Sequence, residues 1–162
     1  MKMRQRIVNK DQALQKIRHY CAYQERCHAE VREKLYGYGL YKTEVETILA
    51  QLIEEDYLNE ERFAEQFAGG KFRIKQWGRV RIQYALKQKK VSDYSIRKAM
   101  KSIDEDDYLR TLEKQAKLKW NSLKGEKTIS KQAKTTQYLM QKGFELPLIQ
   151  QAIKTCSNKN TD

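Results

Sequence analysis

Basic side chains are concentrated in one short stretch of the chain, and they are its strongest chemical signal. Residues 71–101 contain eleven Lys and Arg against one acid, Asp93. Clustered ammonium and guanidinium groups bind polyanions, above all phosphates. The same stretch contains aromatic side chains that can stack on a base or anchor a protein partner. The candidate contact residues are Lys71, Arg73, Lys75, Trp77, Arg79, Arg81, Tyr84, Lys87, Lys89, Lys90, Arg97 and Lys98.

Two simpler interpretations of this stretch stay open. Lys-rich helical faces are often only solvated surface, and Trp77 is equally well explained by packing between helices. On a helix from Gly78 to Lys89, however, Ile82 falls on one side while Val80 and Tyr84 fall roughly opposite. An exposed tyrosine and valine among positive charges indicates a contact surface.

Residues suited to catalysis or metal binding lack a matching pattern. The sequence contains no Walker-type loop, dinucleotide fingerprint, His-Glu-x-x-His or nucleophile elbow. His19, His28, Cys21, Cys27 and Cys156 have no spacing typical of a zinc module or a disulfide framework. We therefore predict a protein that is not an enzyme, with no metal or cofactor, whose cysteines are small buried fillers.

The elements that position the basic stretch are predicted to be helices. Apolar residues recur at spacings of three and four along nearly the whole chain, as at Leu14 and Ile17. One proline and seven glycines in 162 residues supply few of the turns that a β-sandwich or a doubly wound sheet needs. We expect about nine helices. Capping chemistry places helix starts at Thr43 with Glu46, at Asn59, at Ser92 and at Pro147.

Three segments share one hydrophobic pattern, which indicates an internal repeat. In each segment a helix ends at a tight stop, formed by Gly39, Lys90 or Gly143, and the apolar residue that follows is expected to pack back on the helix. The matched sets are Leu35, Leu40, Val45 and Leu49, then Leu86, Val91, Ile96 and Met100, and finally Leu139, Phe144, Ile149 and Ile153.

The predicted fold is all-α, with three tandem three-helix repeats that form an elongated, curved array. The helix that opens the second repeat is expected from Asn59 to about Phe72, with Gly69 and Gly70 interrupting its end. Residues 121–129 are expected to be a mobile loop. The predicted boundaries are a basic N-terminal tail at 1–10, repeats at 11–56, 57–103 and 104–156, and a frayed C-terminus at 157–162.

The net charge of +12 favours a polyanionic partner and is unevenly distributed. Residues 11–70 carry a net −5, whereas residues 71–101 carry +10. No run of about 18 apolar residues predicts a membrane span, and Met1 to Lys10 lacks the apolar stretch of a secretory signal. We expect a cytoplasmic monomer, because the repeats can satisfy one another within one chain.

The sequence YLNEERFAE at residues 57–65, followed by a basic stretch with Trp77 and Gly78, closely resembles the RecX family. The resemblance continues through GRVRIQYALKQKKVS at residues 78–92 and covers the three-unit layout of about 11–156. It implies a binding protein that lies along the groove of the RecA filament on single-stranded DNA. Such a protein would restrain filament growth, ATP hydrolysis, strand exchange and RecA-assisted LexA cleavage. The middle repeat would face DNA phosphates and acidic RecA surface, while the outer repeats would span neighbouring protomers.

Two other classes of function stay open. The first is a general DNA-binding helical protein without RecA dependence, in which the helix from Asp93 to Ser102 would enter the major groove. That helix carries Arg97 and Lys98 but no Asn or Gln to read adenine edges, so phosphate contact is favoured over sequence readout. The second is a helical scaffold for an unrelated protein.

Overall fold

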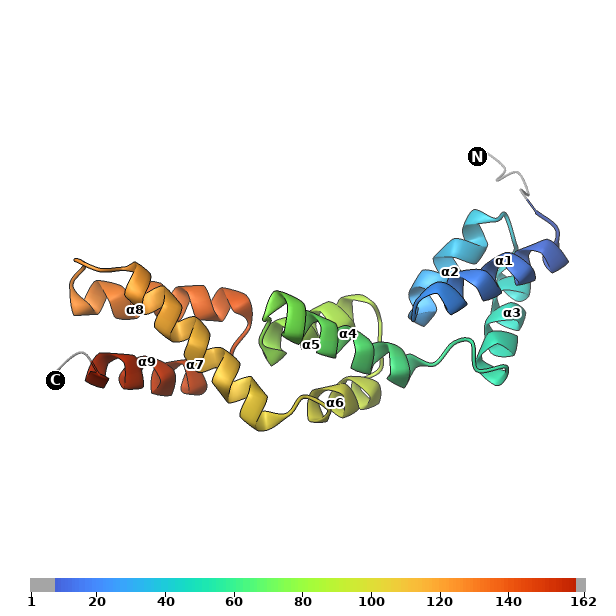
Figure 1. Ribbon diagram of the computed structural model, residues 1–162. Helices are drawn as coiled ribbons and strands as arrows, with labels where there is room; N and C mark the ends of the chain where they lie inside the picture. Colours follow the sequence, from blue (N-terminus) through green and yellow to red (C-terminus); the bar gives the residue numbers. More distant parts are fainter. Residues whose placement is uncertain (1–7, 160–162) are drawn as a thin grey trace. The chain divides into compact units, whose positions relative to one another are not determined.

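The computed structural model describes residues 8–159, and this part of the chain contains nine α-helices and no strand (Figure 1). The predicted all-α class is confirmed. Within the same residues, no helix combines the length and the apolar character needed to cross a membrane. The helices are α1 (Lys10–Tyr23), α2 (His28–Gly37), α3 (Lys42–Glu54), α4 (Glu60–Lys75), α5 (Arg79–Gln88), α6 (Asp93–Lys101), α7 (Glu105–Ser122), α8 (Thr128–Lys142) and α9 (Leu146–Lys159).

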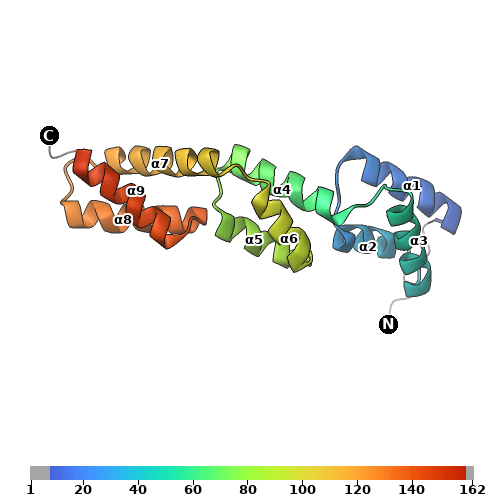
Figure 2. The same ribbon diagram turned by 90° about the horizontal axis from the view of Figure 1, so that it is seen from below.

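Contacts divide the chain into two compact units, each described here by itself. Unit 1 comprises Met1–Gln66 with Leu86–Lys98, and unit 2 comprises Phe67–Ala85 with Ala99–Asp162. In unit 1, α1, α2 and α3 pack against one another, and in unit 2 α7, α8 and α9 do the same (Figures 1 and 2). Because α4 and α5 both continue from one unit into the other, the predicted boundaries of the three repeats stay a prediction.

The internal repeat is visible in burial and in backbone conformation. All twelve matched apolar side chains are buried. Gly39, Lys90 and Gly143 each adopt a left-handed backbone, with φ of 83°, 60° and 96°. After two of these turns the next residue closes the helix end, because Val91 N–H donates to Leu86 O and Phe144 N–H donates to Leu139 O, both at 3.1 Å.

Two predicted helix caps are confirmed and one is wrong. The Asn59 side chain accepts from Arg62 N–H at 2.9 Å, and Ser92 Oγ accepts from Ser95 N–H at 3.3 Å. Helix α3, however, begins at Lys42, where the carboxylate of Glu44 accepts from Tyr41 N–H at 3.2 Å. Thr43 is therefore already the second residue of the helix rather than its cap, and Glu46 instead pairs with Arg32 at 2.9 Å. Pro147 lies in the first turn of α9, as expected.

The helices extend further than the sequence suggested. Helix α4 continues without interruption through Gly69 and Gly70 to Lys75. The expected loop at 121–129 shrinks to residues 123–127, because α7 continues to Ser122 and α8 begins at Thr128. Residues 157–159 belong to α9 rather than to a frayed end, and the other members of the two predicted tails, 1–7 and 160–162, lie outside the described residues.

The cysteines of the first repeat are buried thiols. Cys21 lies in the core formed by α1, α2 and α3, and Cys27 precedes α2. Burial raises the pKa of Cys21 to about 11, so this side chain stays protonated at neutral pH. Both positions agree with the predicted role of small fillers. Cys156 is half-buried on α9.

Candidate functional site

The end of α4 places Trp77 next to two cations. Gln76 adopts a left-handed backbone with φ of 56°, and Trp77 N–H donates at 3.2 Å to the carbonyl oxygen of Lys71, which lies six residues earlier in the last turns of the helix. The chain thereby turns back towards α4. Lys71 Nζ lies 4.9 Å from the centre of the indole, and the guanidinium carbon of Arg81 lies 4.1 Å from it. Trp77 is half-buried and makes cation–π contacts with both.

The start of α5 is held by the end of α8. Gly78 N–H donates to Lys142 O at 2.8 Å, and Val80 N–H donates to Gly143 O at 2.9 Å. Two amides of one helix start thus use carbonyls that another helix leaves unpaired at its end. The backbones touch, because a Cβ on Gly78 would lie 2.4 Å from the carbonyl carbon and oxygen of Gly143. This contact sets the direction of α5 within unit 2.

Arg79, a predicted contact residue, is used to hold unit 2 together. Its guanidinium pairs with Glu105 at 2.9 Å and with Glu145 at 2.8 Å, and it stacks 3.9 Å over the ring of Tyr108. Burial lowers the pKa of Arg79, but these carboxylates raise it by more, so the net pKa lies above its usual value. Only 20% of its side chain is exposed. Arg79 therefore joins α5 to the starts of α7 and α9.

The remaining predicted residues of unit 2 form what we call the Trp77 surface. The guanidinium of Arg73 folds back over Gly69, where a Cβ would come within 2.8 Å of Nη1. Val80 and Tyr84 are 53% and 65% exposed on α5. Among the described residues, none of the cations of this surface pairs with a carboxylate. The Trp77 surface consists of Lys71, Arg73, Lys75, Trp77, Val80, Arg81 and Tyr84.

The other five predicted residues belong to unit 1, and two of them make ion pairs there. Lys89 Nζ lies 3.0 Å from Glu30, and this hydrogen bond raises the pKa of Lys89. Lys98 Nζ lies 2.6 Å from Glu61. The other three, Lys87, Lys90 and Arg97, are exposed. Lys90 is the residue with the left-handed backbone at the end of α5.

The motif at residues 57–65 serves the fold of unit 1. The Glu60 carboxylate accepts from Ser92 N–H at the start of α6, and Arg62 pairs with Glu25 and with Asp56. Phe63 is 5% exposed. This motif therefore contributes helix capping, ion pairing and core packing to unit 1.

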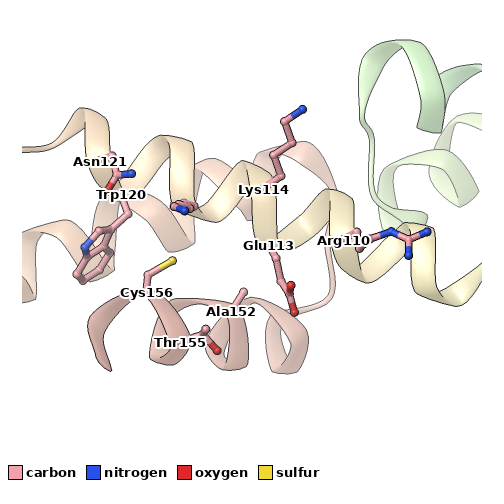
Figure 3. A pocket seen from close by; sticks show the side chains of 9 residues that line it. Arg110, Glu113, Lys114, Trp120, Asn121, Ala152, Thr155 and Cys156 are labelled. Carbon is pink, nitrogen blue, oxygen red and sulfur yellow. The ribbon is translucent and has the colours of Figure 1, made fainter. Parts of the chain in front are cut away.

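A separate hollow of about 440 Å³ lies between α7 and α9 (Figure 3). Trp120 and Ala152 supply apolar lining, while Lys114 and Lys117 supply charge. Cys156 also lines it, but neither histidine of the chain does, so the hollow has no Cys–His pair for nucleophilic catalysis. None of the twelve predicted contact residues lines it.

Sequence reasoning missed the part of this site that comes from the third repeat. Lys142 Nζ donates to Lys75 O at 3.1 Å, which adds a cation at the edge of the Trp77 surface. Arg81 donates to Gln141 O at 3.2 Å from the same helix end. The available signal was the glycine pair, since Gly78 directly precedes one helix and Gly143 ends another in a chain that has few glycines. Their contact depends on a packing of helices that spacing along the chain does not encode.

Comparison with known proteins matches two RecX domains. The model of the second three-helix domain of RecX matches residues 59–100, and that of the third three-helix domain matches residues 105–153. The regulatory protein RecX of Clostridium perfringens strain 13 is 29% identical over 131 residues, which are 80% of this chain and 61% of that protein. RecX of Streptococcus uberis is 33% identical over 133 residues, or 81% of this chain and 50% of that protein. The chain thus spans only about half to three fifths of these relatives.

The fold is shared with a solved structure. The crystal structure of RecX from Lactobacillus salivarius superposes with a TM-score of 0.84 at 22% sequence identity, and the match covers 91% of this chain and 96% of that one. The relatives cited above are named as regulatory proteins. With two domain matches that together cover more than half of its residues and a common fold, this chain belongs to the RecX family.

Proposed function

We propose that this chain binds RecA and its filament on single-stranded DNA and inhibits the recombinase, ATPase and co-protease activities of RecA. The Trp77 surface carries the proposal within unit 2. It combines cations that pair with no carboxylate within the described residues, an indole in contact with two of these cations, and an exposed valine and tyrosine. Such a mixture suits a partner that presents both phosphates and a protein face.

The arrangement of the surface supports binding rather than chemistry. Lys71 and Arg81 are oriented by their contacts with Trp77, so less side-chain entropy is lost when they meet a phosphate or a carboxylate. Val80 and Tyr84 supply the apolar contact area that a protein partner requires. Inhibition would follow from occupancy: a chain seated on the filament blocks the movements and exchanges of RecA protomers without breaking a bond.

The test replaces three cations of the surface, as K71A/R73A/R81A, and measures RecA ATPase activity on single-stranded DNA as the chain is added. We expect at least a tenfold higher concentration for half inhibition, since three charged contacts at about 0.5–1 kcal/mol each are removed. Arg79 is left intact because it supports the fold. Unchanged inhibition by the folded variant would refute the role of the surface.

A control variant of equal charge change makes the result specific. Lys114, Lys117 and Lys124 are exposed in unit 2 but do not belong to the Trp77 surface. K114A/K117A/K124A should inhibit RecA like the unsubstituted chain. If the chain instead binds duplex DNA equally well with and without RecA and leaves the ATPase rate unchanged, the alternative of a general DNA-binding protein holds.

A further inference from the structure

Unit 1 contains a groove that brings tyrosines and cations together, although the segment of residues 11–70 in which it lies is acidic overall. The groove lies between α1 and α2, which pack side by side (Figure 1), and has a volume of about 700 Å³. It is open, so it suits a chain passing along it better than an enclosed small molecule. The groove is lined by Lys16, Tyr20, Tyr23, Arg26, Lys34 and Tyr38, together with His19 and Ala22.

The cations of the groove are placed on the tyrosine faces. The guanidinium carbon of Arg26 lies 3.7 Å from the ring centre of Tyr20, and Arg26 Nε also donates to Tyr20 O at 3.2 Å. Lys34 Nζ lies 5.3 Å from the same ring, and Lys16 Nζ lies 5.9 Å from the ring of Tyr38. Positive charge and flat aromatic surface therefore alternate within one groove.

These cations have no acidic partner within the described part of the chain. None of Lys16, Arg26 and Lys34 forms an ion pair there, whereas Arg18, on the same helix as Lys16, pairs with Glu55 at 2.7 Å. Glu30 and Glu33 border the groove on the α2 side, and the carboxylate of Glu30 is already paired with Lys89.

Tyr23 is the aromatic group that is open to a ligand. It is the last residue of α1 and is 83% exposed, so packing against the core does not account for an aromatic side chain at this position. Tyr20 and Tyr38 are half-buried against the core of unit 1 and form the floor. Burial raises the pKa of both floor phenols, which keeps them uncharged at neutral pH.

We propose that the α1–α2 groove is a single-stranded nucleic-acid site, in which a base stacks on Tyr23 and the backbone phosphates contact Lys16, Arg26 and Lys34. Stacking platforms interleaved with cations are the usual means of binding single strands without sequence preference. An acidic protein segment would use the cations but would gain little from the exposed ring of Tyr23. The inference concerns the chain alone and does not depend on RecA as a partner.

The test uses the intact chain without RecA and an oligothymidine that carries 5-iodouracil. Irradiation followed by peptide mapping should locate the cross-link at Tyr23 or at its neighbours Tyr20 and Tyr38. Anisotropy with the same oligonucleotide should show at least about a fivefold loss of affinity for Y23A, because one stacked base is lost. Y23F should bind like the unsubstituted chain, since it keeps the ring.

A matched control excludes a general effect of removing a tyrosine. Tyr41 is 73% exposed in the same unit and does not line the groove, so Y41A should bind oligothymidine normally. Cross-links only at tyrosines outside the groove, or unchanged affinity of folded Y23A, would overturn the proposal. Equal affinity for an abasic strand of the same length would also overturn it and would assign the groove to acidic partners in general. RecA inhibition is measured separately, so a failure here is distinct from a failure of the proposed function.

Discussion

Lys90 contributes to the backbone conformation of a turn rather than to a contact surface. It occupies the left-handed position that glycine fills in the other two repeats. A side chain at that position costs about 1–2 kcal/mol because Cβ crowds the following carbonyl. The sequence predicted this turn from the repeat alone, since Val91 had to fold back as Leu40 and Phe144 do.

The prediction at this scale is that K90G stabilises the protein. Relief of backbone strain is partly offset by the greater freedom of glycine in the unfolded chain, so we expect a net gain of about 0.5–1 kcal/mol in the free energy of unfolding. Urea unfolding followed by circular dichroism measures it. K87G removes the same charge inside helix α5 and should lose about 1 kcal/mol. A loss of stability in K90G would show that the turn is not strained.

At the scale of elements, the junction of α5 with α8 positions the Trp77 surface within unit 2. Each helix end there supplies hydrogen-bonding groups that the other lacks, at 2.8 Å and 2.9 Å. The approach is close because both positions lack a side chain, and Arg79 then ties α5 to α7 and α9. The direction of the Trp77 surface within unit 2 therefore depends on Gly78 as much as on the cations themselves.

We predict that G78A destabilises the protein by about 1–3 kcal/mol, because the new methyl group overlaps backbone atoms that cannot rotate away. Chemical unfolding of the full chain measures the change. Gly70 is the matched control, since a Cβ there meets nothing within 4 Å in the middle of α4. G70A should gain roughly 0.5–1 kcal/mol. Equal stability of G78A and the unsubstituted chain would contradict the junction described here.

The success and the failures of the sequence-based prediction have one cause. Periodicity and capping report local structure, so the all-α class, the left-handed turns and the caps at Asn59 and Ser92 were predictable. Local signals give a wrong prediction where tertiary packing overrides them. Gly69 and Gly70 were expected to interrupt a helix, but α4 continues through both. For the site, the cations were found but their partners were not: nothing in the spacing of Arg79 indicates Glu105 and Glu145.

At the scale of the whole molecule, net charge is a poor guide to where a polyanion binds. Residues 11–70 are acidic overall, yet the α1–α2 groove within them presents three cations that form no ion pair in the part of the chain that the structure describes. Four of the twelve acids of this segment form ion pairs with Arg18, Arg32 and Arg62. The effective charge of a surface is set by which groups are left over after such pairs form. Each unit then offers its own cationic contact area.

This separation predicts additive effects on the salt dependence of binding to long polythymidine. Each phosphate contact contributes about 0.7 to the slope of log affinity against log salt concentration for single strands. Loss of three contacts should therefore lower the slope by about 2, both in K71A/R73A/R81A and in K16A/R26A/K34A. The variant that combines all six of these substitutions (the six-fold variant) should have a slope lower by about 4, while K114A/K117A/K124A should keep the full slope. If the six-fold variant loses no more than either triple variant, only one of the two areas contacts the strand, and the triple variant that keeps the full slope identifies the area that does not.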